Sequence, residues 1–265
     1  MHPRFGASSW ITPYGLALVL ACALCFWLTR RRARAAGWDV SHIDFALPLS
    51  FVVGALGAKL LAVLVFDRLL LFALLLAALP VLGIYCRLAG LSFLRLGDLL
   101  APPLLLWLAV LRVGCFCAGC CWGDVIDLPN AAAHVQVATL PLLNAWLAFT
   151  AVTFPPGSFA AQQHAALELI LSIGSPSLPV LPTQLYEAFA LVALYIVLTR
   201  AERKQTHRDG TVVFATVSAY ASLRLGIEFL RADNPLVFGM LTGNQLVCMA
   251  LLGIGGWRLL AHRRS

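Results

Sequence analysis

The sequence predicts an all-α, polytopic membrane protein with about seven transmembrane helices. Of its 265 residues, 61% are hydrophobic and only 12% are charged, whereas soluble domains average about 25% charged residues. The apolar residues form long runs, and a helix needs about 20 mostly apolar residues to cross a bilayer. These runs do not alternate between apolar and polar residues as the strands of a membrane barrel do. We expect a single integral membrane domain over residues 1–265.

The apolar runs give the predicted spans in order along the chain. They cover residues 13–29, 44–66, 69–86, 97–114, 184–199, 211–230 and 242–260. The first run is not expected to be a secretory signal peptide, because a signal peptide carries its positive charge before the apolar region. Here the arginine-rich segment 30–34 follows the run, so we expect this span to stay in the membrane.

The net charge of +7 predicts an orientation in the membrane, and no nucleic-acid partner is expected. If the N-terminus lies outside and the C-terminus in the cytoplasm, most basic residues fall at cytoplasmic helix ends, as the positive-inside rule requires. These residues are Arg30, Arg31, Arg32, Arg34, Arg87, Arg95, Arg200, Arg203, Lys204, Arg208, Arg258, Arg263 and Arg264.

Residues 120–182, rich in Pro, Ser and Gln, are predicted to form a periplasmic or interfacial excursion within this domain. The stretch 136–154 is fairly apolar but contains Pro141 and Asn144. A membrane span here would reverse every later segment and place the basic residues of 199–210 outside, against the positive-inside rule. An interfacial helix fits this stretch better.

Five ionisable residues lie in or at the edge of predicted spans: Lys59, Arg112, Glu187, Arg224 and Glu228. Charges inside a bilayer are expensive and mark functional sites by default. All but Lys59 lie toward the outer ends of three helices, and Arg224 and Glu228 share a helix face at i, i+4 spacing. A single charge near a helix end can snorkel to the headgroups, but four at one depth favour a site.

Arginines that face an outer-leaflet cavity suggest a phosphate ligand, since a guanidinium binds phosphate oxygens through two parallel hydrogen bonds. The nearest phosphate in a membrane is a phospholipid headgroup. Tyr14 begins the first span at the same outer level.

Several motifs, taken together and in order, resemble prolipoprotein diacylglyceryl transferases, which are bacterial inner-membrane enzymes. "LRVGCFCAGCCWG" (111–123) is similar to that family's Arg-x-Gly-Asn-Phe-x-Asn-Gly-Glu-x-x-Gly run. "LPTQLYEAFA" (181–190) resembles its His-Pro-Ser-Gln-Leu-Tyr-Glu element, and "YASLRLGIEFLRADNP" (220–235) resembles its Tyr-x-x-x-Arg-x-x-x-Glu-x-x-Arg element. Further similarities are found in "ITPYGLALVLA" (11–21), "GALGAK" (54–59, with Lys in place of Arg) and "GNQLVCMALLGIGG" (243–256).

The resemblance implies transfer of a diacylglyceryl group from phosphatidylglycerol to the lipobox cysteine thiol of a preprolipoprotein, with release of glycerol phosphate. It implies a multi-pass protein of the bacterial inner (plasma) membrane with its site toward the periplasm. The partners would be phosphatidylglycerol and the prolipoprotein. We expect no cofactor, assign no metal ligands, and predict no oligomeric state.

The resemblance also implies most of the expected site residues, and the reactive-thiol interpretation given below adds Cys115 and Cys120. Those expected to be catalytic are Arg112, Arg224, Glu228, Tyr14, Cys115 and Cys120. Those expected to bind substrate are Gly114, Gly119, Gly123, Gln184, Tyr186, Glu187, Arg231 and Lys59. In this hypothesis Arg112 and Arg224 hold the lipid phosphate, Glu228 orients Arg224, and Tyr14 positions a headgroup or assists proton transfer.

The chain departs from the family's pattern at several polar positions. Where the pattern has Asn, Asn and Glu, the sequence has Cys115, Ala118 and Cys120, and Leu181 replaces the His before Pro. The family's His-Gly-Gly element has no counterpart, because residues 66–86 contain no histidine. The residues considered as substitutes for the missing base are His134, His164 and Glu187.

The cysteines allow three interpretations. Cys22, Cys25, Cys86 and Cys248 lie within predicted spans and are expected to be small core residues. The cluster of Cys115, Cys117, Cys120 and Cys121 could serve as small packing residues with one disulfide, as a soft-metal site, or as a reactive thiol beside Arg112.

Two functions remain as alternatives to the transferase. One is a non-catalytic lipid-binding scaffold of the same fold, and the other is a cysteine-based redox or metal membrane protein.

Overall fold

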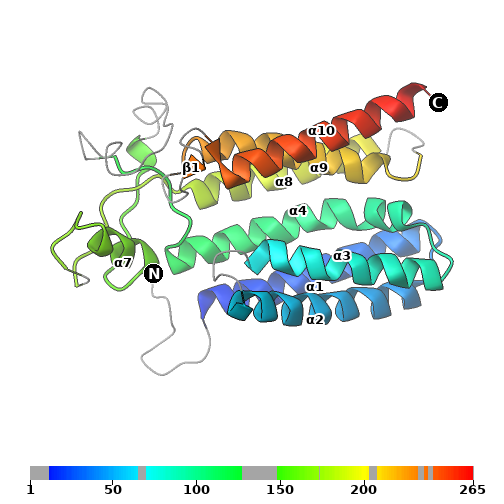
Figure 1. Cartoon of the computed structure of the whole chain (residues 1–265), viewed down its shortest axis with the longest axis horizontal. Helices are drawn as coiled ribbons and strands as arrows, with labels where there is room; N and C mark the ends of the chain where they lie inside the picture. Colours follow the sequence, from blue (N-terminus) through cyan, green and yellow to red (C-terminus); the bar gives the residue numbers. More distant parts are fainter. Residues whose placement is uncertain are drawn as a thin grey trace.

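The structure, a computed structural model, describes residues 12–64, 70–126, 148–172, 174–202, 208–231, 236–237 and 241–264. Most of this part is an elongated bundle of helices that run side by side (Figure 1). The long helices are α1 (Pro13–Ala35), α2 (Val40–Leu64), α3 (Leu70–Leu88), α4 (Phe93–Ala118), α8 (Thr183–Glu202), α9 (Thr211–Glu228) and α10 (Gly243–Arg264). Each coincides with one of the predicted apolar runs, so the helical class and the order of the helices are confirmed.

Five of these helices, α1, α2, α4, α8 and α10, are long and apolar enough to cross a membrane. In α3 the apolar stretch found among the described residues is shorter, Ala77–Leu88. Helix α9 contains Arg224, Glu228 and several Ser and Thr residues, which lower its hydropathy. That α3 and α9 also cross the membrane therefore stays a prediction.

Helix α4 is the centre of the bundle. It packs against α1 on one side and against α8 and α9 on the other, and Figure 1 shows it between these two groups. More of α4 is buried than of any other candidate span in the described residues. Because both groups of helices contact α4, a polar residue on this helix can connect them.

Local sequence accounts for where α1 and α4 begin and end. The hydroxyl of Thr12 accepts a hydrogen bond from the Gly15 amide (3.0 Å), and Pro13 starts α1, as is typical of helix N-termini. Helix α4 ends at Gly119, whose φ of 72° lies in the left-handed region that glycine adopts without strain. This turn sends the chain back across the end of α4.

A polar network joins four helices at one end of the bundle, here called the basic end. Arg32 of α1 forms an ion pair with Glu202 of α8 (2.6 Å) and donates to backbone carbonyl oxygens in α4. The Asp98 carboxylate of α4 accepts hydrogen bonds from the amides of Gly210 and Val213. These amides belong to the start of α9, where a negative charge complements the helix dipole.

At the opposite end, here called the site end, the chain between α4 and α8 packs against the end of α4 (Figure 1). Its described part contains the short helices η1 (Ala148–Thr150) and α7 (Phe159–Ala166). Its buried core consists of Trp122, Val125, Phe154, Ala160 and Val180. Residues 127–147, which include most of the stretch expected to form an interfacial helix, lie outside the described residues.

A small hairpin lies between α9 and α10 at the site end. Strand β1 (Leu236–Val237) pairs antiparallel with β2 (Leu241–Thr242). It directs the chain from the end of α9 into the first turn of α10, so residues of both helices reach the same polar cluster.

Candidate active site

Arg112, in the last two turns of α4, contacts Glu187 near the start of α8. The guanidinium Nε lies 2.9 Å from the carboxylate Oε2, and the two side chains are 13% and 1% exposed. A buried ion pair contributes little net stability, although removing one partner leaves an uncompensated charge. A guanidinium has five N–H donors, so pairing through Nε fixes Arg112 while leaving other nitrogens for a second anion.

Arg224 and Glu228 form a second buried ion pair within α9. The Nη2 of Arg224 lies 2.7 Å from the Oε2 of Glu228. The other carboxylate oxygen accepts hydrogen bonds from the Thr242 hydroxyl (2.6 Å) and the Asn244 amide (3.3 Å). Glu228 is thus held from the hairpin and α10 and contacts Arg224. That Glu228 orients Arg224 for a substrate stays a prediction.

Hydrogen bonds join the turn after α4 to the start of α8. Gln184 Nε2 donates to the carbonyl oxygen of Cys120 (2.7 Å), and the Thr183 hydroxyl donates to that of Cys121 (3.0 Å). Gly123 forms a backbone bridge with Arg231. A side chain at Gly123 would lie within 2.8 Å of neighbouring atoms in three residues, so this close approach requires glycine. The three predicted motifs therefore meet at one place.

Three buried polar atoms at this place have no hydrogen-bond partner among the described residues. They are Gln184 Oε1, Glu187 Oε1 and Arg224 Nη1. Buried side-chain polar atoms in proteins are nearly always paired with protein or water. Their positions on α8 and α9, beside the two ion pairs, indicate that a polar ligand or water completes the cluster.

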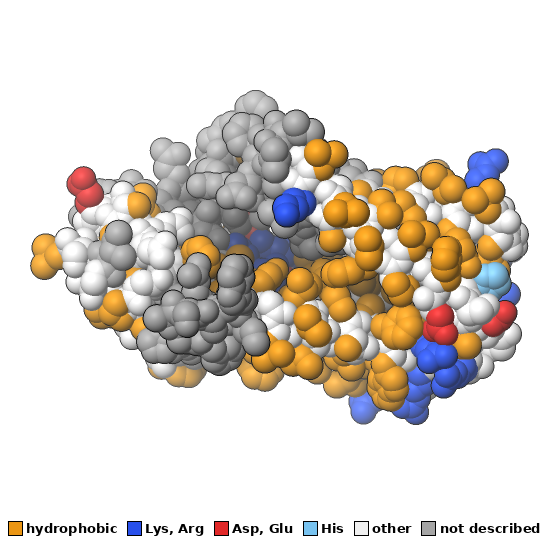
Figure 2. All heavy atoms as spheres, turned by 90° about the horizontal axis from the view of Figure 1, so that it is seen from below, with side chains coloured by type: hydrophobic (Ala, Val, Ile, Leu, Met, Phe, Trp, Pro, Cys, Tyr) orange, Lys and Arg blue, Asp and Glu red, His pale blue; other side chains and the backbone are white. Residues whose placement is uncertain are grey.

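Basic side chains lie at the bottom of a hollow in one face of the molecule, bordered by hydrophobic side chains (Figure 2). At the site end, Arg112, Arg224 and Arg231 are the buried or nearly buried arginines of the described helices and their ends. Arg112 and Arg224 both lie close enough to Tyr220 to act on its phenol electrostatically. Arg112 and Arg231 are likewise electrostatic neighbours. The arginines of α4 and α9 thus converge.

Tyr14 reaches the same cluster from α1. Its electrostatic neighbours are Arg112 and the thiols of Cys115, Cys120 and Cys121. This approach is possible because α1 and α4 cross closely at Gly114. A Cβ there would lie 2.7 Å from that of Ala17, so any larger residue would separate the helices.

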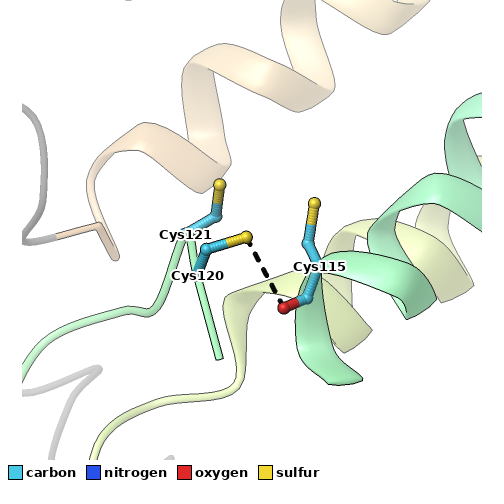
Figure 3. Close-up of side chains that lie close together, drawn as sticks. All are labelled: Cys115, Cys120 and Cys121. Atoms are coloured by element: carbon cyan, nitrogen blue, oxygen red, sulfur yellow. Dashed lines mark hydrogen bonds between the residues drawn. The ribbon is translucent and has the colours of Figure 1, made fainter. Parts of the chain in front are cut away.

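Three cysteine thiols cluster where the chain turns back at the end of α4 (Figure 3). The Sγ atoms of Cys115, Cys120 and Cys121 all lie within 4.8 Å of one another. The pKa of the Cys121 thiol lies well below its usual range, because hydrogen bonds from Cys115 and Cys120 and the positive charges of Arg231 and Arg112 favour the thiolate. All eight cysteines, each among the described residues, are free thiols.

Residues 6–261 match the sequence model of a protein family that is described as "Prolipoprotein diacylglyceryl transferase". The chain belongs to this family. A relative from Nitratidesulfovibrio vulgaris, named phosphatidylglycerol–prolipoprotein diacylglyceryl transferase, is 28% identical over 94% of this chain and 89% of its own length. Relatives of the same name from Clostridium tetani (23% identical, 91% of this chain, 89% of the relative) and Legionella pneumophila strain Paris (31% identical, 68% and 57%) also match.

Two of the clustered cysteines occupy positions where the pattern of prolipoprotein diacylglyceryl transferases, given above, has Asn and Glu. These are Cys115 and Cys120, whose thiols lie close to each other and to that of Cys121. Two of the departures from the family pattern therefore lie within one group of thiols, near Arg112. Cys117 and the span cysteines lie outside this group, and Cys25, Cys86 and Cys248 are buried, as expected for core residues.

Other predicted residues lie apart from the two ion pairs. Lys59 is exposed on α2, a helix that packs on α3 and α1. The Tyr186 hydroxyl is hydrogen bonded to that of Thr150. Gly119 forms the turn after α4. The roles predicted for Lys59 and Tyr186 in substrate binding stay predictions.

The substitutes considered for the missing base fall into different places. His134 lies outside the described residues. His164 is fully buried, its ring stacks edge-on against Trp122, and its Nδ1 accepts from the Leu178 amide. Burial lowers the pKa of His164 to about 4, so it is a neutral structural residue. Glu187 is within the cluster but is already paired with Arg112.

Several residues of the cluster were not singled out from the sequence. Tyr220 begins the matched element 220–235 but was given no role, although it precedes Arg224 and Glu228 at four-residue spacing on the same face of α9. Thr183, Thr242 and Asn244 carry no charge, and their importance follows only from the hydrogen bonds they make.

Proposed function

We propose that the protein transfers a diacylglyceryl group from phosphatidylglycerol to the thiol of the lipobox cysteine in a preprolipoprotein. Membership of the prolipoprotein diacylglyceryl transferase family supports this reaction, and the curated relatives are named for it. The structural observation that carries the proposal is the convergence of Arg112 and Arg224, from separate helices, beside buried polar atoms that have no hydrogen-bond partner among the described residues.

The chemistry follows from the charges in the site. The substrate sulfur, as thiolate, attacks the glyceryl carbon bonded to the phosphate oxygen, and that C–O bond breaks. The electron pair leaves with the oxygen as glycerol phosphate, and the thiol proton passes to solvent or to the leaving phosphate. Arg112 and Arg224 hold the phosphate and stabilise the negative charge that grows on it, as preorganised donors do in other enzymes. Glu228 keeps Arg224 in position through its ion pair.

The proposed location is the bacterial inner membrane, with the site end toward the periplasm. In this arrangement all seven long helices cross the bilayer, the N-terminus lies outside, and residues 120–182 lie on the periplasmic side. The positive-inside rule supports it, because Arg32, Arg95 and Arg200 belong to the basic end. Both substrates are held in the membrane, and the hollow in Figure 2 lies beside the apolar flank of the bundle.

Complementation tests the proposal. A strain depleted of its own transferase is supplied with this protein, and a reporter lipoprotein is analysed by mass spectrometry. We expect the reporter to gain the mass of one diacylglyceryl group with the wild type and with Arg200→Ala, an exposed control on α8. Arg224→Ala should give none at equal membrane abundance. An unmodified reporter with the wild-type protein would overturn the proposal.

The loss of the family's His and Glu favours one alternative, a lipid-binding scaffold without catalysis. The two functions differ in a single readout. A scaffold would bind phosphatidylglycerol through Arg112 and Arg224 in a vesicle flotation assay and yet leave the reporter unmodified.

A further inference from the structure

The thiol cluster of Cys115, Cys120 and Cys121 is organised by the backbone around it. Cys115 is in the last turn of α4, and the amide of Cys120 donates to the Cys115 carbonyl oxygen (3.1 Å) as the chain reverses at Gly119. Cys121 has a φ of 62°, in the left-handed region that non-glycine residues rarely adopt. Figure 3 shows the three sulfur atoms on the same side of this turn.

Side chains from α8 hold this arrangement in place. The carbonyl oxygens of Cys120 and Cys121 accept hydrogen bonds from Gln184 and Thr183. The turn is thus bonded both to its own helix and to a neighbouring one. A site supported in this way keeps its ligand atoms close before any ligand arrives.

We propose that Cys115, Cys120 and Cys121 bind a zinc ion, whose fourth position takes the thiol of the prolipoprotein substrate. The identity of the fourth ligand rests on the function proposed above. Thiolates are the ligands of zinc in many proteins, and catalytic zinc sites combine three protein ligands with one open position. A tetrahedral zinc with Zn–S distances of about 2.3 Å places its sulfur atoms roughly 3.8 Å apart. Sulfur atoms within 4.8 Å of one another reach that spacing by side-chain rotation.

The charges around the cluster suit such a complex. Three thiolates and Zn²⁺ carry one net negative charge, and both Arg112 and Arg231 act electrostatically on Cys121. Guanidinium groups beside an anionic complex offset the free energy of burying it. Zinc has no redox chemistry under these conditions, so it fits a reaction that alkylates a thiol and transfers no electrons.

The zinc would promote deprotonation of the substrate thiol, a step for which no side chain of the site has been assigned as the base. A thiol that coordinates zinc loses its proton, which is released to water. The coordinated sulfur then attacks the glyceryl carbon, the C–O bond to phosphate breaks, and glycerol phosphate leaves with the electron pair. The product is a thioether, a weak zinc ligand, so it dissociates and reopens the fourth position. The cysteines at the family's Asn and Glu positions thus gain a role.

Metal analysis of the purified full-length protein in detergent under reducing conditions tests binding. We expect about one zinc per chain in the wild type after reconstitution with Zn²⁺ and dialysis. Cys115→Ser and Cys120→Ser should each lose most of it. Cys117→Ser is the matched control, because Cys117 is a neighbouring thiol outside the cluster, and it should keep the metal. A wild type without zinc, a disulfide within the cluster, or equal loss in Cys117→Ser would overturn the proposal.

Cobalt spectroscopy tests the fourth ligand without requiring turnover. Co²⁺ in the site should give thiolate charge-transfer and tetrahedral visible bands, and a lipobox peptide should shift both. The same peptide with Ser in place of its Cys should leave them unchanged. A shift with both peptides, or with neither, would overturn coordination by the substrate thiol. If the peptide coordinates but no lipid is transferred, the proposed function fails and the zinc site stands. If metal-free protein transfers lipid, the zinc site is not needed for the reaction, and the proposed function stands.

Discussion

The Arg32 network at the basic end and the cluster at the site end contain similar residue types but differ in how completely their polar atoms are paired. The neighbouring pair Arg30–Asp44 also keeps polar atoms without a partner among the described residues, but its side chains are 37% exposed, so water reaches them. At the basic end, Arg32 donates to two backbone carbonyl oxygens and to both carboxylate oxygens of Glu202. At the site end, Arg224, Glu187 and Gln184 each keep a buried polar atom without a partner among the described residues. A fully paired network stabilises a fold, whereas unpaired polar atoms in a buried cluster require water or a ligand. We infer that one end holds the helices together and the other binds substrate.

The largest effect is expected for Arg112→Lys and Arg224→Lys at the site end. Lysine keeps the charge beside Glu187 and Glu228 but cannot bind a phosphate through two parallel N–H groups. We expect transfer to a lipobox peptide to fall about 10²–10³-fold, with little change in the unfolding temperature. Arg200→Lys, an exposed residue on α8, is the control and should keep the wild-type rate. Full activity in both site variants would abolish the distinction between the two ends.

The reverse pattern is expected for Arg32→Ala at the basic end. Its loss removes the ion pair with Glu202 and two bonds to α4, so unfolding in detergent should become easier by about 2 kcal/mol. The transfer rate per folded molecule should stay unchanged. Arg87→Ala, at an exposed position on α3, should alter neither property. A loss of activity per folded molecule like that of Arg224→Lys would contradict the comparison.

His164 sharpens the comparison, because its Nε2 is also buried without a partner among the described residues, yet it lies in an apolar core. Its pKa in the folded protein is about 4, below the value of about 6.5 in an unfolded chain. As the pH falls from 6.5 toward 4, the unfolded state takes up a proton that the folded state does not. Stability should therefore decrease over this window by roughly 2 kcal/mol.

The check is the difference in unfolding free energy between the wild type and His164→Phe across that pH range. The variant should be less stable at pH 7, because the Leu178 amide loses its acceptor, and the difference should shrink as the pH falls. A constant difference would show that this imidazole does not titrate as its burial requires.

The smallest effect is expected for Thr242→Val, which removes the 2.6 Å hydrogen bond to Glu228 while keeping the side-chain shape. Glu228 would then hold Arg224 less firmly, and we expect about a tenfold lower kcat, equivalent to roughly 1.4 kcal/mol, with KM for the peptide unchanged. Thr242→Ser should restore most of the rate. Equal kcat values for the valine variant and the wild type would show that the hydrogen bond from Thr242 to Glu228 does not help to position Arg224.

The helices were predictable because each is a long apolar run, and the basic residues mark one end of nearly all of them. The pairs Arg112–Glu187 and Arg224–Glu228 were within reach for a related reason, since a charge in an apolar helix needs a partner. Their exact partners were not all predictable: nothing in the sequence indicates that Thr242 would contact Glu228, because that contact depends on the hairpin that folds between α9 and α10.

The thiol cluster is a second feature that the sequence predicts only in part. Four cysteines within seven residues were evident, but the spacing alone does not say which of them meet. The left-handed turn at Gly119 and the unusual φ of Cys121 decide it: three sulfur atoms come together and Cys117 is left out.

The most direct test of the central claim is an experimental structure of the protein with phosphatidylglycerol bound. The account predicts the lipid phosphate at the site end, within hydrogen-bond distance of the guanidinium groups of Arg112 or Arg224, with its acyl chains leaving between helices toward the bilayer. A phosphate bound at the basic end, or a site end that holds no lipid at saturating phosphatidylglycerol, would contradict it.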